Sequence, residues 1–291
     1  FRSSFVYHME SDRYRPGFIV YTNRYALMTS DGTTTHLIAG NSTQGGYREG
    51  MGAEARFNIT KGFTQISEKL VVVADSHNHC MRLINRTTNN TSVFSGKCKS
   101  HGYQDGRPGQ FFYPRSVVMD KRDKNQLLIT DYNNKAVRTV DVMSQAVGTF
   151  LKSDSLKNIR GITQDGKNGD LFVTADNALY RITYTQRTVT LISGSPGDNS
   201  GYRDGKLLNC LFNYPHGLIF IAAHTLLVAD YGNHRLRLLD TILDKSTTLN
   251  VKKSLFFPSS TLLTATSMNV GQHRKIIQYV CKYNAKYFHS L

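Results

Sequence analysis

Three stretches of the sequence repeat one pattern, in which an apolar run leads through a polar turn into a second apolar run. The copies read VVVADSHNHCMRLIN (71 to 85), LLITDYNNKAVRTVD (127 to 141) and LLVADYGNHRLRLLD (226 to 240). A related glycine-rich lead-in segment precedes each copy, starting at Gly46, Gly102 and Gly201. A recurrence of roughly 45 to 55 residues built from short strands indicates a β-propeller, because a single blade cannot bury its own faces and must stack on neighbours.

Weaker copies of the pattern fill the rest of the chain. Residues 171–184 align with the clear copies when Asn177 is placed on their repeated Asn, and residues 18–40 and 261–280 supply a first and a last unit. We therefore expect an all-β fold, a six-bladed β-propeller of four-stranded antiparallel blades. The single domain spans 1–291, with approximate blades at 1–45, 46–101, 102–152, 153–200, 201–250 and 251–291.

The clear copies share a polar motif of the form D-x-x-N-H-x-x-R. Its members are Asp75, Asn78, His79 and Arg82, then Asp131, Asn134 and Arg138, then Asp230, Asn233, His234 and Arg237. With the upstream F-N-x-P-x-G segment at Phe212, Asn213, Pro215 and Gly217, the chain resembles NHL-repeat proteins of the extracellular type. The resemblance implies a six-bladed propeller. The family includes extracellular binding modules, RNA-binding domains of ubiquitin-ligase proteins and a metal-dependent peptide-amidating lyase, so it implies no single function.

The repeated Asp, Asn and Arg have a structural interpretation. Asp and Asn stabilise tight turns by bonding nearby backbone groups, and an Arg packed between two sheets needs a carboxylate or carbonyl partner. We expect Arg181 to occupy the repeated Arg position in the fourth unit, whereas Leu27 and Ile276 replace it in the first and last. A catalytic residue is needed once, so residues that recur in most units are favoured as structural.

The cysteines indicate the redox environment. Cys80 starts the third strand of its unit and Cys98 follows the fourth, and antiparallel pairing brings both to one blade edge, so we predict a Cys80–Cys98 disulfide. A second bond between Cys210 and Cys281 is geometrically conceivable, the alternative being two buried free thiols. A disulfide favours an oxidising, extracellular setting.

Glycosylation sequons point the same way. They lie at Asn41, Asn58, Asn85, Asn89 and Asn90, each two residues before a Ser or Thr, with no Pro between. All except Asn58 fall in loops expected between strands, where a glycan is sterically allowed. The overlap of Asn89 and Asn90 leaves room for one glycan there. We therefore expect a glycoprotein.

Charge gives the main indication of partners. The formal net charge is +15 and no Lys/Arg-rich tract accounts for it, so the fold must assemble the positive surface. One such assembly is predicted where the innermost strand of each blade begins beside the central channel. Lys61, Arg115, Arg160 and His216 occupy that position in successive units, with Pro16 and Ser259 in the other two. We interpret these four basic residues as a site for an anionic partner at the channel mouth, the alternative being a coincidence in a basic chain.

Enzymatic function has little support in the sequence. There is no G-x-S-x-G, H-E-x-x-H or C-x-x-C motif, which argues against nucleophile-elbow, zincin and thiol-redox chemistry. A lyase like the amidating relative needs several His on one metal, and His216 is the only His expected to face the channel. We expect neither catalysis nor a cofactor nor a bound metal.

Two function classes remain. In the first, the chain is the extracellular propeller of a secreted or cell-surface protein and binds a protein or an acidic glycan through a loop face. In the second, it is an intracellular propeller that binds single-stranded RNA on a basic face with aromatic stacking. The disulfide and the sequons favour the first. No apolar run of about 18 residues could span a bilayer, and the lack of an initiating Met and a signal peptide leads us to expect a piece of a longer polypeptide.

Overall fold

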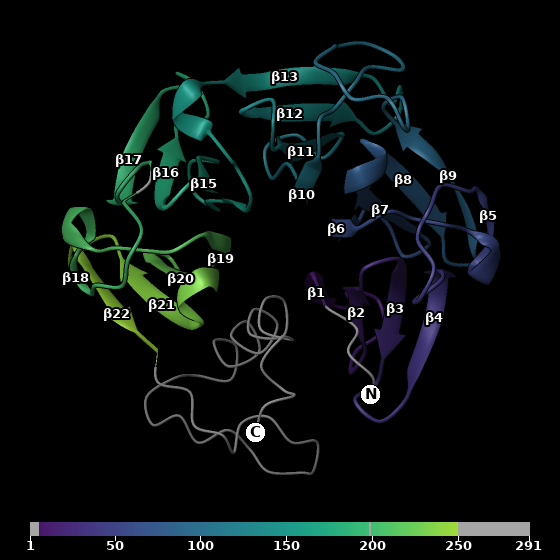
Figure 1. The fold of residues 1–291 in the computed structure, drawn as a ribbon, viewed down its shortest axis with the longest axis horizontal. Coiled ribbons are helices and arrows are strands. Elements are labelled where there is room, and N and C mark those ends of the chain that lie inside the picture. Colours follow the sequence, from purple (N-terminus) through teal and green to yellow (C-terminus); the bar gives the residue numbers. More distant parts are fainter. Residues whose placement is uncertain (1–5, 198, 250–291) are drawn as a thin grey trace.

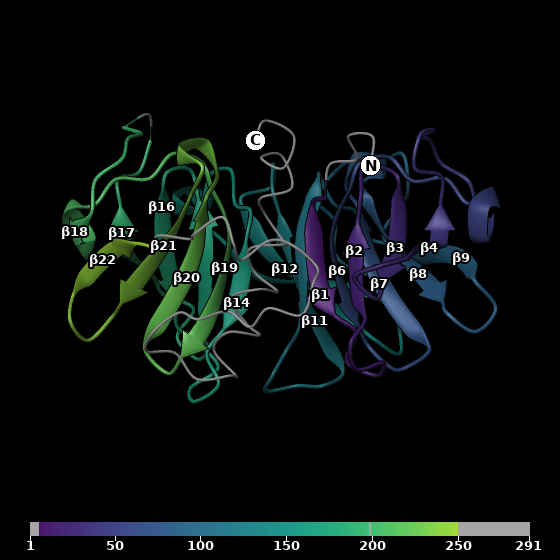
Figure 2. The same ribbon diagram turned by 90° about the horizontal axis from the view of Figure 1, so that it is seen from below.

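The structure is a computed structural model that describes residues 6–197 and 199–249 of the chain. These residues form five antiparallel sheets that follow one another around a central axis, as the blades of a β-propeller (Figure 1). Seen from the side, the strands run between two faces that carry the connecting loops (Figure 2). The expected all-β propeller of four-stranded antiparallel blades is therefore observed.

The blades are numbered along the chain. Blade 1 holds β1 (His8–Ser11), β2 (Ile19–Thr22), β3 (Ala26–Ser30) and β4 (Thr35–Gly40). Blade 2 holds β6 (Thr60–Gln65), β7 (Leu70–Asp75), β8 (Cys80–Asn85) and β9 (Asn90–Ser95), plus the short β5 (Gly50–Met51). Blade 3 holds β10 (Pro114–Met119), β11 (Gln126–Asp131), β12 (Ala136–Asp141) and β13 (Val147–Lys152). Blade 4 holds β14 (Ile162–Gln164), β15 (Leu171–Ala175), β16 (Ala178–Ile182) and β17 (Val189–Gly194). Blade 5 holds β19 (Pro215–Ala222), β20 (Thr225–Asp230), β21 (Arg235–Asp240) and β22 (Lys245–Thr248), plus the short β18 (Gly205–Lys206).

The number of blades differs from the prediction. Five blades are observed rather than six, and the sixth predicted unit, 251–291, lies outside the described residues. The described blades form an arc with blades 1 and 5 at its two ends (Figure 1). In blade 1 the innermost strand is β1, which precedes the region expected to begin the repeat. Pro16 therefore lies in the loop after β1 and not at the channel mouth, where Tyr7 stands instead.

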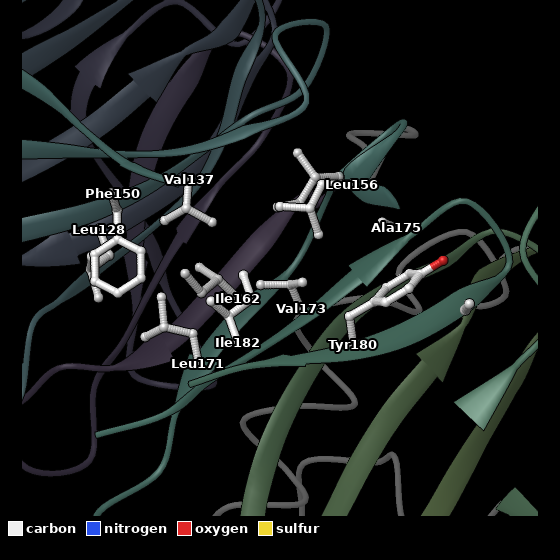
Figure 3. Packing of buried hydrophobic residues seen from close by; sticks show 12 residues of the cluster. Leu128, Val137, Phe150, Leu156, Ile162, Leu171, Val173, Ala175, Tyr180 and Ile182 are labelled. Carbon is white, nitrogen blue, oxygen red and sulfur yellow. The ribbon is translucent and has the colours of Figure 1, made fainter. Parts of the chain in front are cut away.

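The core lies between the blades. Leu128, Val137 and Phe150 of blade 3 pack on Leu171 and Ile182 of blade 4 in one buried cluster (Figure 3). The repeated apolar runs form the central strands, and in blades 2 to 4 their side chains are buried on both faces because each of these sheets has a neighbour on either side. Burial between sheets thus explains why the sequence reads as continuous apolar runs around polar turns.

The repeated polar motif forms a buried network in blades 2, 3 and 5. Arg138 donates from Nη1 to Asp131 Oδ2 at 2.9 Å and to the Gln110 carbonyl at 2.9 Å. Asp131 also accepts a hydrogen bond from the Asn134 amide at 2.7 Å. Arg82 with Asp75 and Arg237 with Asp230 repeat the pair at 3.1 and 2.8 Å. These pairs, called the interblade slots below, give each buried arginine the carboxylate and carbonyls that its burial requires.

Blade 4 departs from this network. Val173 pairs with Tyr180, as Val73 pairs with Arg82 in blade 2, so Tyr180 fills the slot and the expectation for Arg181 is wrong by one residue. A shift of one residue along a strand turns a side chain to the other face of the sheet. The residue equivalent to Asp75 is Ala175, so blade 4 lacks the carboxylate as well as the arginine. Both charges are absent together, which leaves neither one buried alone.

Blade 1 shows the same rule. The bulge that precedes Arg82 in blade 2 lies between Leu27 and Met28, so that Met28, and not the predicted Leu27, occupies the arginine position. Tyr21 pairs with Met28, which places Asn23 at the position of the aspartate. An uncharged pair again replaces the ionic one.

Candidate anion-binding site at the channel mouth

The four basic residues predicted at the channel mouth lie together. Lys61 in β6, Arg115 in β10, Arg160 just before β14 and His216 in β19 line one cavity of about 40 Å³. We call these four residues the channel cluster. Tyr7 and His8 of blade 1 also line the cavity, and neither was expected from the sequence. Their contribution followed only from the strand β1, which carries no lead-in segment of the repeat.

Backbone contacts between blades position the cluster. The Thr22 hydroxyl of blade 1 donates to the Lys61 carbonyl of blade 2 at 2.7 Å. The hydroxyls of Thr130 and Thr174 donate in the same way to the carbonyls of Arg160 and His216, at 2.8 and 2.5 Å. Each threonine lies on the second strand of its blade and contacts a residue in or just before the first strand of the next. Most members of the cluster therefore have a backbone tied to the preceding blade.

Glycine next to the cluster keeps the inner strands close. A Cβ at Gly161 would lie 2.2 Å from the His216 carbonyl oxygen, and a Cβ at Gly62 would lie 2.8 Å from the Arg115 carbonyl oxygen. Both distances are shorter than a side chain tolerates, so glycine is needed there. The close approach of neighbouring strands brings basic side chains from separate blades to one cavity.

Aromatic rings support the basic side chains. Lys61 Nζ lies 3.7 Å from the centre of the Tyr7 ring, and the Arg115 guanidinium lies 3.9 Å from the centre of the Tyr132 ring. His216 stacks on Tyr231 with ring centres 4.4 Å apart. The cation–π contacts of Lys61 and Arg115 hold a positive group without neutralising it. The charge therefore stays available to a ligand.

Burial and mutual repulsion lower the pKa values of the basic groups in the channel cluster. Burial, with the nearby Arg115 and Arg24, lowers the pKa of Lys61 to about 7. Burial lowers the pKa of Arg115 to about 10, with Arg160 contributing through repulsion. Burial likewise lowers the pKa of Arg160. A shift of this kind means that the protein disfavours these charges, and a bound anion would relieve the cost.

His216 differs from the other members of the channel cluster. Burial, followed by repulsion from Arg160 and Arg115, holds the pKa of His216 well below its ordinary value. The imidazole is therefore neutral at pH 7, and the positive charge comes from Lys61, Arg115 and Arg160. His216 contributes a hydrogen-bonding ring rather than a fourth cation.

The hydrogen-bond donors that line the cavity have no carboxylate facing them among the described residues. No Asp or Glu is among the described residues that line it. Arg115 Nε is buried and has no hydrogen-bond partner among the described residues, whereas Arg160 donates to the Asp176 carbonyl at 3.0 Å. Buried donors are normally satisfied. The arrangement is suited to a single anionic group that accepts hydrogen bonds from these side chains.

The predicted disulfide is present. Cys80 at the start of β8 and Cys98 after β9 are bonded, with their Cα atoms 5.0 Å apart. Cys210 is buried and forms no disulfide within the described residues, and its Sγ lies 3.0 Å from the Leu207 carbonyl oxygen. Its suggested partner Cys281 lies outside the described residues, so that second pairing stays a prediction.

The sequons lie at accessible places on blades 1 and 2. Asn89 and Asn90 are exposed in the β8–β9 hairpin, and Asn41, Asn58 and Asn85 are partly exposed. The side-chain carbonyls of Asn41 and Asn85 accept backbone amides within their turns. Glycosylation at these positions stays a prediction.

Within the described part of the chain, no group of three or more His, Cys, Asp or Glu side chains could hold a metal ion. His77 and His101 lie near His79. The His79 ring, however, accepts a hydrogen bond from the Tyr113 amide and packs on aromatic rings. None of the helices in 6–197 and 199–249 is both long and apolar enough for a membrane span.

Comparison with known proteins supports the fold. No model of a known protein family matches the chain. NHL repeat-containing protein 2 of Gallus gallus is 31% identical over 112 residues, which cover 37% of this chain and 15% of that protein. The matched segment is thus a small part of the relative.

Solved structures show the propeller over most of the chain. A structure of a nidogen/laminin complex matches with a TM-score of 0.62 and 12% identity, covering 85% of this chain and 81% of the matched chain. An auxiliary nutrient binding protein from Bacteroides ovatus matches with a TM-score of 0.63 and 13% identity, covering 84% and 57% of the two chains. A catalytically inactive virginiamycin B lyase from Staphylococcus aureus matches with a TM-score of 0.53 and 14% identity, covering 84% of each chain. At these identities the likeness concerns the fold alone.

Proposed function

We propose that this chain, an NHL-like β-propeller, is an extracellular, non-enzymatic binding module that holds an anionic group of a protein or acidic glycan at its channel mouth. The observation that carries the proposal is the cavity where Lys61, Arg115 and Arg160 meet without a carboxylate among the described lining residues. We also propose that residues 251–291 form the sixth blade, which would close the arc between blades 5 and 1. Two similar structures, a nidogen/laminin complex and an auxiliary nutrient binding protein, support a binding role.

The size of the cavity favours one kind of anion. The cavity has a volume of about 40 Å³, which suits a compact carboxylate or sulfate group better than a sugar ring or a base. A side-chain carboxylate or a sugar sulfate projects from its parent chain and can enter such a cavity. An RNA phosphodiester is flanked by riboses on both sides and lies along a surface instead. The geometry therefore favours an acidic protein or glycan over single-stranded RNA.

Titration with inorganic sulfate tests the site. The measurement is the NMR shift of the Gly62 and Gly161 amides, which lie beside the cluster, in the unmodified protein and in Arg115→Gln. The variant should bind sulfate roughly tenfold more weakly, because a buried charge-assisted contact is lost. Lys124→Gln, which changes an exposed lysine on the β10–β11 loop, is the matched control. Equal affinity in Arg115→Gln and the unmodified protein would remove the site.

Single-stranded oligouridine tests the alternative in the same protein. RNA binding that is lost in Arg115→Gln, with no response to sulfate, would support the RNA-binding function instead.

Expression through a secretory pathway tests the compartment. Enzymatic deglycosylation should lower the intact mass, and reduction should add the mass of about two hydrogens for the Cys80–Cys98 bond. A mass that deglycosylation leaves unchanged would contradict the glycoprotein prediction.

A further inference from the structure

A second polar groove lies at the opposite end of the inner strands, between blades 3 and 4. It is formed by the loop after β10, the loop between β14 and β15 and the residues that follow β16, and encloses about 570 Å³. Arg115 is the second residue of β10 and Lys121 lies two residues after its end, so the groove and the channel cluster are separated by the length of that strand. Its volume lies in the range of pockets that bind small molecules, roughly 300–1,000 Å³.

The groove is built from the residues that make blade 4 unlike its neighbours. Arg181 lies one residue beyond the interblade slot, where the strands of blades 2, 3 and 5 carry Leu83, Thr139 and Leu238. It donates from Nε to Asp170 Oδ2 at 2.8 Å. Asp170 replaces Leu70 of blade 2, to judge by its place three residues before the paired valine. Packing of the repeat does not require this ion pair, because the other blades lack it.

Arg122 is held in place on the other wall of the groove. Its guanidinium lies 4.8 Å from the centre of the Tyr184 ring and donates from Nη1 to the Asn168 carbonyl at 2.9 Å. The Tyr184 hydroxyl in turn donates to the buried carboxylate of Asp120 at 2.6 Å. Arg122 is nonetheless exposed, so a ligand in the groove can reach its guanidinium. An ordered arginine with free donors is a typical anion-binding group.

Cations outnumber carboxylates among the residues that line the groove. The cations Lys121, Arg122, Lys167 and Arg181 face the carboxylates Asp165 and Asp170. The Lys167 side chain is exposed at the tip of the β14–β15 loop, and Asp165 accepts the backbone amides of Lys167 and Asn168 at 2.9 Å each. The loop is thus ordered by its own turn while its amine remains open. A net positive groove attracts an anionic ligand.

The remaining lining identifies the ligand class. Thr183, Thr185 and Gln186 add hydroxyl and amide groups, and no aromatic or large apolar side chain is among the described residues of the lining. A nucleobase needs an aromatic surface to stack on, and a peptide needs an apolar pocket for its side chains. A sugar with several hydroxyls and one acidic group satisfies both the paired donors and acceptors and the excess of cations.

We propose that the groove between blades 3 and 4 binds an acidic saccharide, a sugar that carries a sulfate or a carboxylate. The acidic group is bound by Arg122 and Lys167, and the hydroxyls exchange hydrogen bonds with the polar lining. Blade 4 lacks the slot arginine of the repeat and carries instead the Asp170–Arg181 pair, from just before β15 to β16, which assigns specificity to a blade that departs from the pattern. This site does not depend on the channel cluster.

The test uses a glucuronic acid–N-acetylgalactosamine 4-sulfate disaccharide, titrated into the full chain by calorimetry. Arg122→Glu with Lys167→Glu should weaken binding at least roughly tenfold, since two charge-assisted contacts become repulsive. Lys124→Glu carries the same charge reversal on an exposed lysine that does not line the groove, and should bind as the unmodified protein does. Arg115→Gln, in the channel cluster, should also keep full affinity.

Two further probes separate the ligand classes. The neutral disaccharide N-acetyllactosamine should bind much more weakly, and a tetraglutamate peptide should not displace the acidic disaccharide. The proposal is overturned by equal losses in the Lys124 and the Arg122/Lys167 variants, since binding would then reflect net charge alone. Displacement by tetraglutamate, or undiminished affinity of the Arg122/Lys167 variant with a native circular dichroism spectrum, would overturn it as well.

Discussion

The molecule buries basic side chains in two regions, the interblade slots and the channel mouth, and treats them differently. In a slot, Arg138 has the carboxylate of Asp131 at 2.9 Å and further contacts to carbonyl oxygens. At the channel mouth, Arg115 lies on the Tyr132 ring and its Nε has no hydrogen-bond partner within the described chain. A buried charge with all its partners supports the fold, whereas a buried charge without a counter-ion raises the free energy of the folded state until a ligand supplies one.

The residues that repeat from blade to blade are therefore different from the residues suited to binding. The slots repeat in blades 2, 3 and 5 with the same partners, and the two exceptions replace both charges by neutral residues. The channel cluster varies from blade to blade at one position, from lysine to arginine to histidine. A position that changes its chemistry in a constant backbone frame is suited to recognition.

The largest expected effect comes from removing the counter-ion in a slot. Asp131→Ala leaves Arg138 buried without its carboxylate and should lower the free energy of unfolding by about 3–5 kcal/mol. Urea unfolding measures it. Asp131→Ala with Arg138→Tyr copies the Ala175 and Tyr180 of blade 4 and should recover most of the loss. A double variant no more stable than the single one would break the comparison between the blades.

Removal of the disulfide should come next in size. Cys80→Ala with Cys98→Ala frees a link across 18 residues and should cost about 3 kcal/mol in unfolding experiments. The slot of blade 2 keeps Arg82 and Asp75, so sulfate binding at the channel should not change. Weaker sulfate binding in this variant would show that the two regions are coupled rather than separate.

Replacing a buried arginine should change the free energy of unfolding in opposite directions in the two regions. Arg115→Met removes a buried, repelled charge and should raise the free energy of unfolding by roughly 1 kcal/mol while weakening sulfate binding roughly tenfold. Arg138→Met removes a paired charge, leaves Asp131 alone and should lower the stability. Both are measured by urea unfolding in parallel. The same sign for both variants would contradict the distinction between structural and binding cations.

The smallest expected effect is a pH dependence of binding. Lys61, with its pKa near 7, is charged below that pH and neutral above it. Sulfate affinity should therefore fall as the pH rises, by roughly threefold between about pH 6 and about pH 8.5. Lys61→Arg keeps its charge and should flatten the profile. A profile in the unmodified protein as flat as that of Lys61→Arg would show that Lys61 takes no part.

Local repetition made the propeller and its disulfide predictable. Strand, turn and strand recur with the same polar residues, so the placement of Cys80 and Cys98 at one blade edge followed from the pattern alone. The meeting of Lys61, Arg115 and Arg160 at one cavity followed from the same register. Equivalent positions in a circular repeat must converge on the axis, which is why spacing was sufficient.

Departures from the repeat were harder to predict. The turn before Arg181 is two residues shorter than in blade 2, and alignment on Asn177 allowed for only one of them, so Tyr180 and not Arg181 occupies the slot. Strand β1 lacks the lead-in segment, so Tyr7 and His8 were missed. The groove between blades 3 and 4 joins segments of two blades that share no motif. Only the three-dimensional arrangement brings such residues together.

The threonine contacts between blades set the geometry of the channel mouth through the backbone. Thr22, Thr130 and Thr174 hold the carbonyls of Lys61, Arg160 and His216, not their side chains. The frame is therefore independent of which residue stands at each of these places. A protein engineer could vary the rim one blade at a time and obtain receptors of differing selectivity on an unchanged scaffold.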